Sequence, residues 1–302
     1  MVVNETTIAL SSLFVNGSIP LSVTVNTATN WTQYLFSAMI TLFASFGIFI
    51  LIYLPRILKS FKGGSLRAIS NITKKNVVMI KHTEQALFSQ SMIDQNCLRD
   101  MSEIMNKMNG QDFDLILHTP GGDVFSSLAV SRLIKQYPGK IRAIVPLFSM
   151  SGGSLLALSC KELLMGSNAC LGPCDVQLGS FFSSGSSRNW NEIVKFKGKK
   201  ADDQSISFAM TGKQYTKSIS AHLHKIIDFG LDTKQKDKLI GFMTDGNIEH
   251  AYPLTITDLN NFGIKTQTLI NFKFLKLLAK IINSPGKEGV NYYKIGEKIW
   301  NR

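Results

Sequence analysis

Cysteine is scarce in this sequence and never forms a CxxC pair. The chain of 302 residues contains four cysteines, which are Cys97, Cys160, Cys170 and Cys174. Cys170 and Cys174 are close together, but no histidine and no second cysteine pair accompanies them. A disulfide framework and a zinc site both need such pairs. The cysteines are therefore expected to be reduced, mostly buried thiols, and no metal site is expected.

Acidic residues are also few, at 21 against 33 lysines and arginines, which gives a formal net charge of +12. No zinc finger, RNP-type strand or helix-turn-helix pattern occurs, and aromatic residues do not interleave with the dispersed lysines. A nucleic-acid partner is therefore not expected. Such a positive net charge is typical of a protein bound at an anionic lipid surface, or of one from an organism whose proteins are rich in lysine.

Charge is absent from residues 33–54, which read QYLFSAMITLFASFGIFILIYL. About 20 helical residues at about 1.5 Å each cross the hydrocarbon core of a bilayer. Trp31, Tyr34 and Tyr53 stand where an aromatic belt would mark the two interfaces. This run predicts one transmembrane helix, because the remaining sequence is too polar for several spans and too apolar for disorder.

The two flanks of this run differ in charge. The leader, residues 1–32, has a single charged residue, Glu5, and lacks the basic start of a signal peptide, so the apolar run is expected to be retained. Residues 55–76 form a basic juxtamembrane hinge. The positive-inside rule then predicts a single-pass membrane protein with an extracytoplasmic leader and a cytoplasmic C-terminal domain.

Residues 77–270 alternate short apolar runs with segments of helical periodicity. The expected strands are 77–80, 113–117, 141–145 and 163–165, and the expected helices are 92–108, 123–137 and 155–158. Strands that alternate with helices indicate βα units, and strands that are apolar at nearly every position indicate a parallel sheet covered on both faces. The fold class is therefore α/β.

Residues 271–302 begin with a basic amphipathic segment, NFKFLKLLAKIIN, and continue as a polar tail. Its apolar residues lie on one helical face and its lysines on the others. Two interpretations are open. The helix packs on its own domain or on a partner subunit, or residues 272–282 lie on the inner leaflet of the membrane.

Two glycine-rich turns follow two of the expected strands. The first, LILHTPGGD, contains Gly121 and Gly122, and the second, IVPLFSMSGGS, contains Ser151 and Gly152. Where a strand passes into a helix, the backbone N–H groups of the turn are free to bind an oxyanion, and a serine there places its hydroxyl beside them. The second turn is neither G-x-S-x-G nor a P-loop, which excludes the α/β-hydrolase and P-loop interpretations.

Further motifs occur in order around these turns. Lys81-His82-Thr83-Glu84 precedes them, LGPCDVQ with Asp175 follows, and EHAYPL with His250 comes later. Together they resemble the serine dehydrogenase proteinase family, a membrane-anchored branch of the Clp-protease-like serine peptidases near the signal-peptide peptidases. The resemblance covers most of the chain and implies a ClpP/crotonase-like fold.

This resemblance also implies roles. Ser151 would be the nucleophile of a serine peptidase, and the turn at Gly121 and Gly122, together with Gly152, would form the oxyanion hole. Peptide or protein substrates, a homo-oligomer and the absence of any cofactor are expected on the same grounds.

The general base is left open between lysine and histidine. Residues 171–177, where Clp proteases have their histidine, contain none, whereas signal-peptide peptidases use a lysine 40–50 residues after the serine. That window contains Lys199 and Lys200, the first choices, and Lys197, the second. Such a lysine needs burial or neighbouring cations to act as a base. Lys213 and Lys217 are fallbacks.

His250 is the competing base. Related proteins have His-Asp where this chain has His250-Ala251, which removes a local carboxylate. Asp175 could orient a base or line the cleft, and Asp123 is expected to cap a helix.

Two other functions remain open. The same fold could serve as a catalytically inactive membrane scaffold, which the altered His-Ala-Tyr-Pro stretch would suit. It could also be a crotonase-type acyl-CoA enzyme, although such an enzyme needs no serine at the turn.

Overall fold

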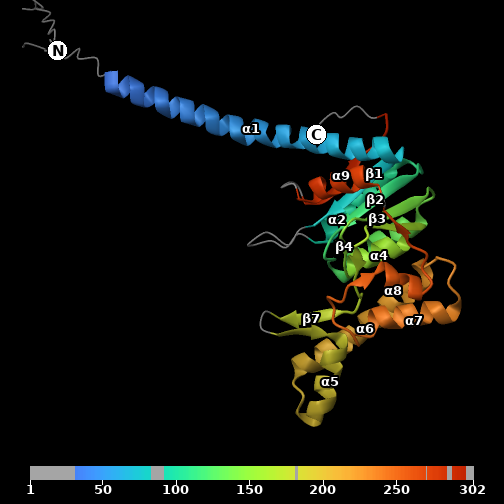
Figure 1. Ribbon diagram of the computed structural model, residues 1–302. Coiled ribbons are helices and arrows are strands. Elements are labelled where there is room, and N and C mark those ends of the chain that lie inside the picture. The colour runs from blue at the N-terminus through green and yellow to red at the C-terminus, as the bar shows by residue number, and fades with distance from the viewer. Residues whose placement is uncertain (1–30, 83–91, 181–182, 270, 284–287, 297–302) are drawn as a thin grey trace, which may run out of the picture. The chain divides into compact units, whose positions relative to one another are not determined.

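The computed structural model describes residues 31–82, 92–180, 183–269, 271–283 and 288–296 (Figure 1). The chain divides into two compact units, Met1–Leu58 and Lys59–Arg302. The predicted leader, up to residue 30, lies outside the described residues. So do Thr83 and Glu84 of the Lys81-His82-Thr83-Glu84 motif.

Helix α1 (Trp31–Thr73) contains the predicted transmembrane run. Several large apolar side chains along it are exposed: Leu35, Phe36, Met39, Ile40, Leu42, Phe43, Phe46 and Ile48. The side chains of residues 49–54 are outside the described part. In the portion of the chain whose placement is described, no helix reaches the length and apolarity that a membrane crossing requires.

The second unit is built on a six-stranded sheet in the order β10-β5-β3-β2-β1-β11, as far as the structure describes the chain. Five strands are parallel: β1 (Asn76–Lys81), β2 (Phe113–His118), β3 (Ile141–Val145), β5 (Glu162–Met165) and β10 (Gln267–Thr268). The parallel α/β prediction is confirmed. An antiparallel edge strand, β11 (Gly289–Tyr293), pairs with β1 and was not expected from the polar tail.

Helices cover both faces of this sheet, which explains why β1 and β2 are buried at every position. One face packs against α2 (Gln95–Met108), α3 (Val124–Gln136) and α4 (Gly152–Ser159). The opposite face, with Val77 and Ile116, packs against the last turns of α1 and against α9 (Phe272–Asn283).

Helix α9 therefore belongs to the domain. Helix α9 lies beside the last turns of α1 (Figure 1). Its apolar residues Phe274, Leu278 and Ile281 are buried in the same cluster as Leu66 and Ile69 of α1, while its lysines are exposed. The structure thus shows the apolar face of this helix packed on its own domain. The compact unit, Lys59–Arg302, contains more of the chain than the domain expected at residues 77–270.

A second group of elements extends from the sheet on the side of α4. A small sheet joins β4 (Phe148–Ser149), β6 (Cys170–Leu171) and β9 (Leu254–Thr255). A hairpin of β7 (Gln177–Ser180) and β8 (Ser183–Ser186) leads into α5 (Ser187–Lys197) and the short helix η1 (Gly198–Lys200). Helices α6 (Asp203–Ile226), α7 (Thr233–Thr244) and α8 (Ile256–Asn261) complete the unit. These elements carry the loops that face the glycine turns.

Candidate active site

The two glycine turns lie side by side at the carboxyl ends of β2 and β3. The N–H of Met150 donates to the carbonyl of Thr119 at 2.9 Å, and the N–H of Thr119 donates to the carbonyl of Phe148 at 3.4 Å. Neighbouring parallel strands end at the same edge of a sheet, which is where ligands bind in open α/β folds. The backbone pairing therefore holds the serine turn against the TPGG turn.

Ser151 has an unusual backbone conformation. Its φ is 49° and its ψ is −118°, at the N-cap of α4, and its side chain makes no capping hydrogen bond. A residue other than glycine at positive φ costs on the order of 1–3 kcal/mol and persists only where the surroundings impose it. The Ser151 hydroxyl therefore lies at the start of α4 without capping it.

The TPGG turn requires glycine for steric reasons. Gly121 has a φ of +115°, and a Cβ there would lie 2.8 Å from the Cβ of Ser151. A Cβ on Gly122 would collide with the backbone of Ile93. The N–H of Ile93 donates to the carbonyl of Gly121 at 2.8 Å, and the N–H of Asp123 donates to the carbonyl of Ile93 at 2.9 Å.

This pairing turns the N–H of Gly122 away from Ile93. Among the described residues, neither this N–H nor that of Gly152, the first residue of α4, donates a hydrogen bond. Two free N–H groups beside a serine hydroxyl are the geometry of an oxyanion hole. Asp123 caps α3, as predicted, because its carboxylate accepts from the N–H groups of Phe125 and Ser126.

A histidine and an aspartate meet on the other side of Ser151. Nδ1 of His250 lies 2.7 Å from Oδ1 of Asp175, and Nε2 of Gln177 donates to Oδ2 of Asp175 at 2.6 Å. The Asp175 side chain is 2% exposed and that of His250 is 34% exposed. The aspartate is therefore the fixed, buried partner, and the imidazole is open to the pocket.

The small sheet brings these two residues together. Leu171 of β6 pairs with Leu254 of β9, so the loop after β6 and the turn before β9 lie next to each other. The N–H of Cys174 also donates to the carbonyl of Met243 at 2.7 Å. Pairing of chain segments far apart in sequence thus supplies the carboxylate that Ala251 does not.

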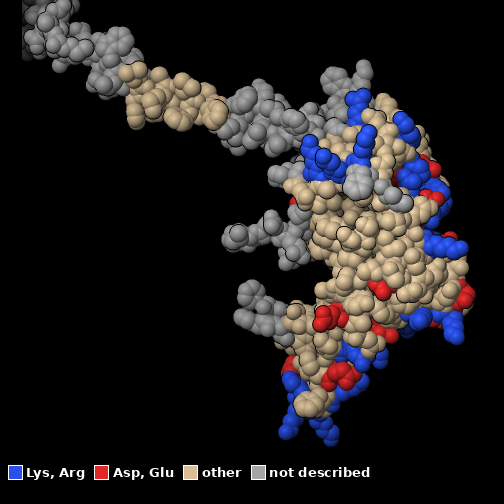
Figure 2. All heavy atoms as spheres, viewed as in Figure 1, with Lys and Arg blue, Asp and Glu red and all other residues tan. Residues whose placement is uncertain are grey.

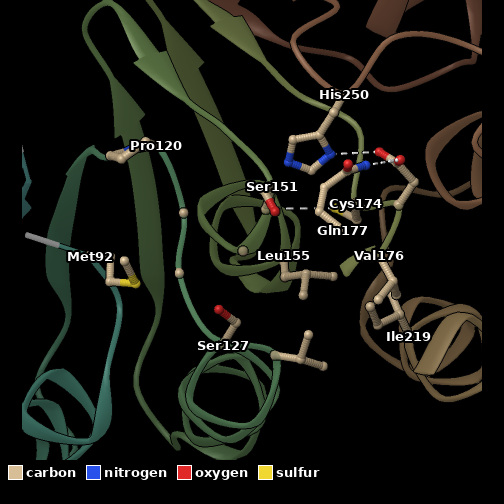
Figure 3. Close-up of a pocket in the computed structure, with 15 residues that line it drawn as sticks. Met92, Pro120, Ser127, Ser151, Leu155, Cys174, Val176, Gln177, Ile219 and His250 are labelled. Atoms are coloured by element: carbon tan, nitrogen blue, oxygen red, sulfur yellow. Dashed lines mark hydrogen bonds and ion pairs between the residues drawn. The ribbon is translucent and has the colours of Figure 1, made fainter. Parts of the chain in front are cut away.

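Ser151, Asp175 and His250 line one pocket of about 580 Å³ (Figure 3). Its wall also includes Gly121, Gly122 and Gly152. A further part of the wall is apolar and consists of Met92, Val124, Leu155, Val176 and Ile219. The pocket thus combines a serine hydroxyl, an imidazole held by a carboxylate, free N–H donors and an apolar recess.

The family model of ClpP-like SDH-type serine proteinases matches residues 28–295. The chain belongs to this family. The resemblance stated from the motifs is thereby confirmed.

Similar chains include two uncharacterized proteins of Methanocaldococcus jannaschii. MJ0137 is 30% identical over 67% of this chain and 72% of its own length. MJ1495 is 27% identical over 82% of this chain and 86% of its own length.

Two solved structures are also similar. ClpP1 from Listeria monocytogenes has a TM-score of 0.42 and 14% identity, over 66% of this chain and 94% of that one. A variant of the 1510-N membrane-bound stomatin-specific protease in complex with a substrate peptide has a TM-score of 0.42 and 16% identity. The match covers 61% of this chain and 74% of that one.

The lysines favoured as the base do not line the pocket of this SDH-type chain. Lys197 lies at the end of α5, where Nζ is 2.9 Å from Oδ2 of Asp202, and Lys199 and Lys200 lie in η1. All three are exposed, and Figure 2 shows basic side chains on the surface at the end of the molecule that α5 forms. Lys213 and Lys217 are likewise exposed on α6. None has the burial that a lysine base needs.

Cys174 also lines the pocket, and its thiol contacts the carbonyl oxygen of Ser151 at 3.3 Å. Burial raises the pKa of this thiol far above its ordinary value. Because the thiolate is the reactive form, Cys174 is not suited to be a nucleophile. The described residues contain no cluster of side chains suited to hold a metal ion.

Proposed function

We propose that this chain is a serine peptidase in which Ser151 is the nucleophile, His250 the general base and Asp175 the residue that orients it. The observation that carries the proposal is the 2.7 Å contact between His250 and Asp175 in the pocket that contains Ser151. Membership of the serine proteinase family supports the reaction class. The strained turn and its two free N–H groups support the role of Ser151.

The reaction follows from these positions. Oδ1 of Asp175 accepts a hydrogen bond from the Nδ1–H of His250, which leaves Nε2 unprotonated and able to take the proton of the Ser151 hydroxyl. The serine oxygen then attacks the peptide carbonyl, and the N–H groups of Gly122 and Gly152 stabilise the oxyanion. His250 returns the proton to the leaving amine, and water hydrolyses the acyl-enzyme by the same steps.

Gln177 has a supporting role in this scheme. Its amide donates to the second oxygen of Asp175, which is almost fully buried and would otherwise lose solvation without compensation. The bond holds the carboxylate in place, with its other oxygen against His250. The contact with Asp175 also favours the peptidase over the inactive scaffold, because it gives His250 the carboxylate that the altered His-Ala-Tyr-Pro stretch lacks.

Peptide hydrolysis by the purified full-length chain tests this function. We expect wild-type protein to cleave a peptide mixture and to form a covalent adduct on Ser151 with a fluorophosphonate, identified by mass spectrometry. Ser151→Ala should lose cleavage by about 10³-fold or more. Cys174→Ala, a change to a neighbouring wall residue, should retain it. Cleavage that survives in Ser151→Ala, or that is lost only in Cys174→Ala, would refute the proposed nucleophile.

Membrane anchoring through residues 33–54, with the C-terminal domain in the cytoplasm, stays a prediction. It is supported by the uncharged run and by the basic residues that follow it. Resistance of the full-length protein to carbonate extraction from membranes would support it, and complete extraction would oppose it.

Assembly into a homo-oligomer is likewise part of the proposal. Helices α5 and α6 expose large apolar side chains, with Phe196 at 93% and Met210 at 62%, and such surfaces are commonly covered by partners. Light scattering of the purified protein should give a multiple of the chain mass, and a monomer would exclude this assembly.

A further inference from the structure

The pocket contains one buried hydroxyl to which the proposed reaction assigns no task. Ser127 lies near the start of α3, is 1% exposed and lines the pocket. Its Oγ has no hydrogen-bond partner among the described residues. By contrast, the buried hydroxyl of Ser131 on the same helix has hydrogen-bond partners. Its Oγ donates to the carbonyl of Leu128 and lies 2.6 Å from Nε2 of His222.

A buried hydroxyl without a partner loses the hydrogen bonds that water would give it. Such groups are rare in folded proteins, and each one calls for an explanation. Serine offers one donor and two acceptor lone pairs, so a bound group with either function could satisfy it. Because Ser127 faces a pocket, a ligand atom can reach it there (Figure 3).

The position of Ser127 relates it to the nucleophile. A Cβ on Gly152 would overlap with Oγ of Ser127 and would lie 3.5 Å from the N of Gly122. The hydroxyl therefore packs against Gly152, whose N–H is one of the proposed oxyanion donors. A side chain attached to the carbonyl under attack would enter the recess beside them.

The surroundings of Ser127 restrict what that side chain can be. Val124, Leu155, Val176 and Ile219 line the recess. Of the titratable groups in the lining, Asp175 and His250 are bonded to each other, and the Cys174 thiol donates to the carbonyl of Ser151. A charged tip would be left without a counter-ion, which is costly in an apolar site. An apolar tip would leave the Ser127 hydroxyl unsatisfied.

We propose that Ser127 is a specificity-determining residue, which hydrogen-bonds an uncharged polar tip on the residue that precedes the cleaved bond. A glutamine fits, with a mostly apolar stem and an amide that both donates and accepts. This inference rests on the proposed peptidase function and adds a substrate class to it. Sites that hydrogen-bond a substrate group discriminate against analogues that lack it.

The test compares two peptide substrates that differ only in glutamine or methionine before the cleaved bond, since these side chains have similar length. In wild-type full-length protein, kcat/KM should favour glutamine. Ser127→Ala should lower the glutamine-to-methionine ratio by about tenfold, the upper range for one neutral hydrogen bond. Ser126→Ala is the matched control. The Ser126 hydroxyl is also buried and without a hydrogen-bond partner among the described residues, but Ser126 does not line the pocket.

The outcomes separate this inference from the function on which it rests. Fluorophosphonate labelling of Ser151 together with an unchanged ratio in Ser127→Ala would overturn the role of Ser127 alone. An equal loss for both substrates, or a wild-type preference for methionine, would also overturn it. A wild-type protein that neither labels nor cleaves would overturn both proposals.

Discussion

At the scale of single residues, the proposed base depends on a carboxylate that the sequence places 75 positions before its histidine. In the proposed reaction, Asp175 determines which nitrogen of His250 carries the proton, and it stabilises the imidazolium that forms during attack. Its burial gives this interaction a low local dielectric, which strengthens the charge-assisted hydrogen bond.

Asp175→Asn tests that role with little change in side-chain volume. We expect kcat for peptide cleavage to fall by about 10³-fold or more, because an amide nitrogen facing Nδ1 favours the wrong tautomer. Asp123→Asn is the matched control, since asparagine also caps helices and kcat should stay within about threefold. Equal losses in the two variants would mean that Asp175 has no special role.

The same residue scale explains what the sequence could not reveal. Ser151, Gly122, Gly152 and the cap at Asp123 were predictable because local turn chemistry determines them. The pairing of Asp175 with His250 was not, because it depends on two-residue strands whose contact no local pattern encodes. The lysines near Lys199 were favoured by spacing alone, and spacing carries no information on burial.

At the scale of elements, the TPGG turn is fixed by the segment that precedes α2. Gly122→Ala would place a Cβ against the backbone of Ile93, which cannot move aside as a flexible side chain could. We expect a loss of about 1–3 kcal/mol in stability and a loss of labelling at Ser151, measured by thermal unfolding and a fluorophosphonate. Gly185→Ala should be tolerated, since its Cβ would meet its nearest atom at 3.5 Å.

Elements were predictable where the sequence pattern reflects their own surroundings. The strands at 113–117 and 141–145, and the helices near 92–108 and 123–137, are confirmed because continuous apolar runs and helical periodicity report burial directly. The β11 edge strand was missed because Gly289–Tyr293 is only partly buried and mixes polar with aromatic residues. This segment forms a strand because it pairs with β1, and its own sequence pattern does not predict one.

At the scale of the whole molecule, the buried histidines at the ends of β1 and β2 make stability depend on pH. Burial, the Lys81 ammonium and the neighbouring His82 lower the pKa of His118 to about 4, from an ordinary value of 6.5. Burial also lowers the pKa of His82. The folded protein therefore keeps His118 neutral until about pH 4, whereas the unfolded chain binds a proton below pH 6.5.

Stability should consequently fall as the pH falls from 6.5 to about 4, and His118 contributes a loss of about 3 kcal/mol across this window. Denaturant midpoints measured at pH 7 and pH 4.5 test this. His118→Phe, which keeps an aromatic ring against Phe148, should flatten the dependence. His224→Gln, at an exposed site, should leave it unchanged. A steep dependence that persists in His118→Phe would contradict this assignment.

The most direct test of the account is the rate at which a fluorophosphonate labels Ser151 in full-length protein with different bases removed. His250→Ala should slow labelling by about 10²-fold or more, the scale of general base catalysis. A triple variant with Lys197→Ala, Lys199→Ala and Lys200→Ala should label within about threefold of wild type, as expected for solvated surface lysines. Slow labelling in the triple variant with normal labelling in His250→Ala would contradict the proposed Ser151–His250–Asp175 arrangement.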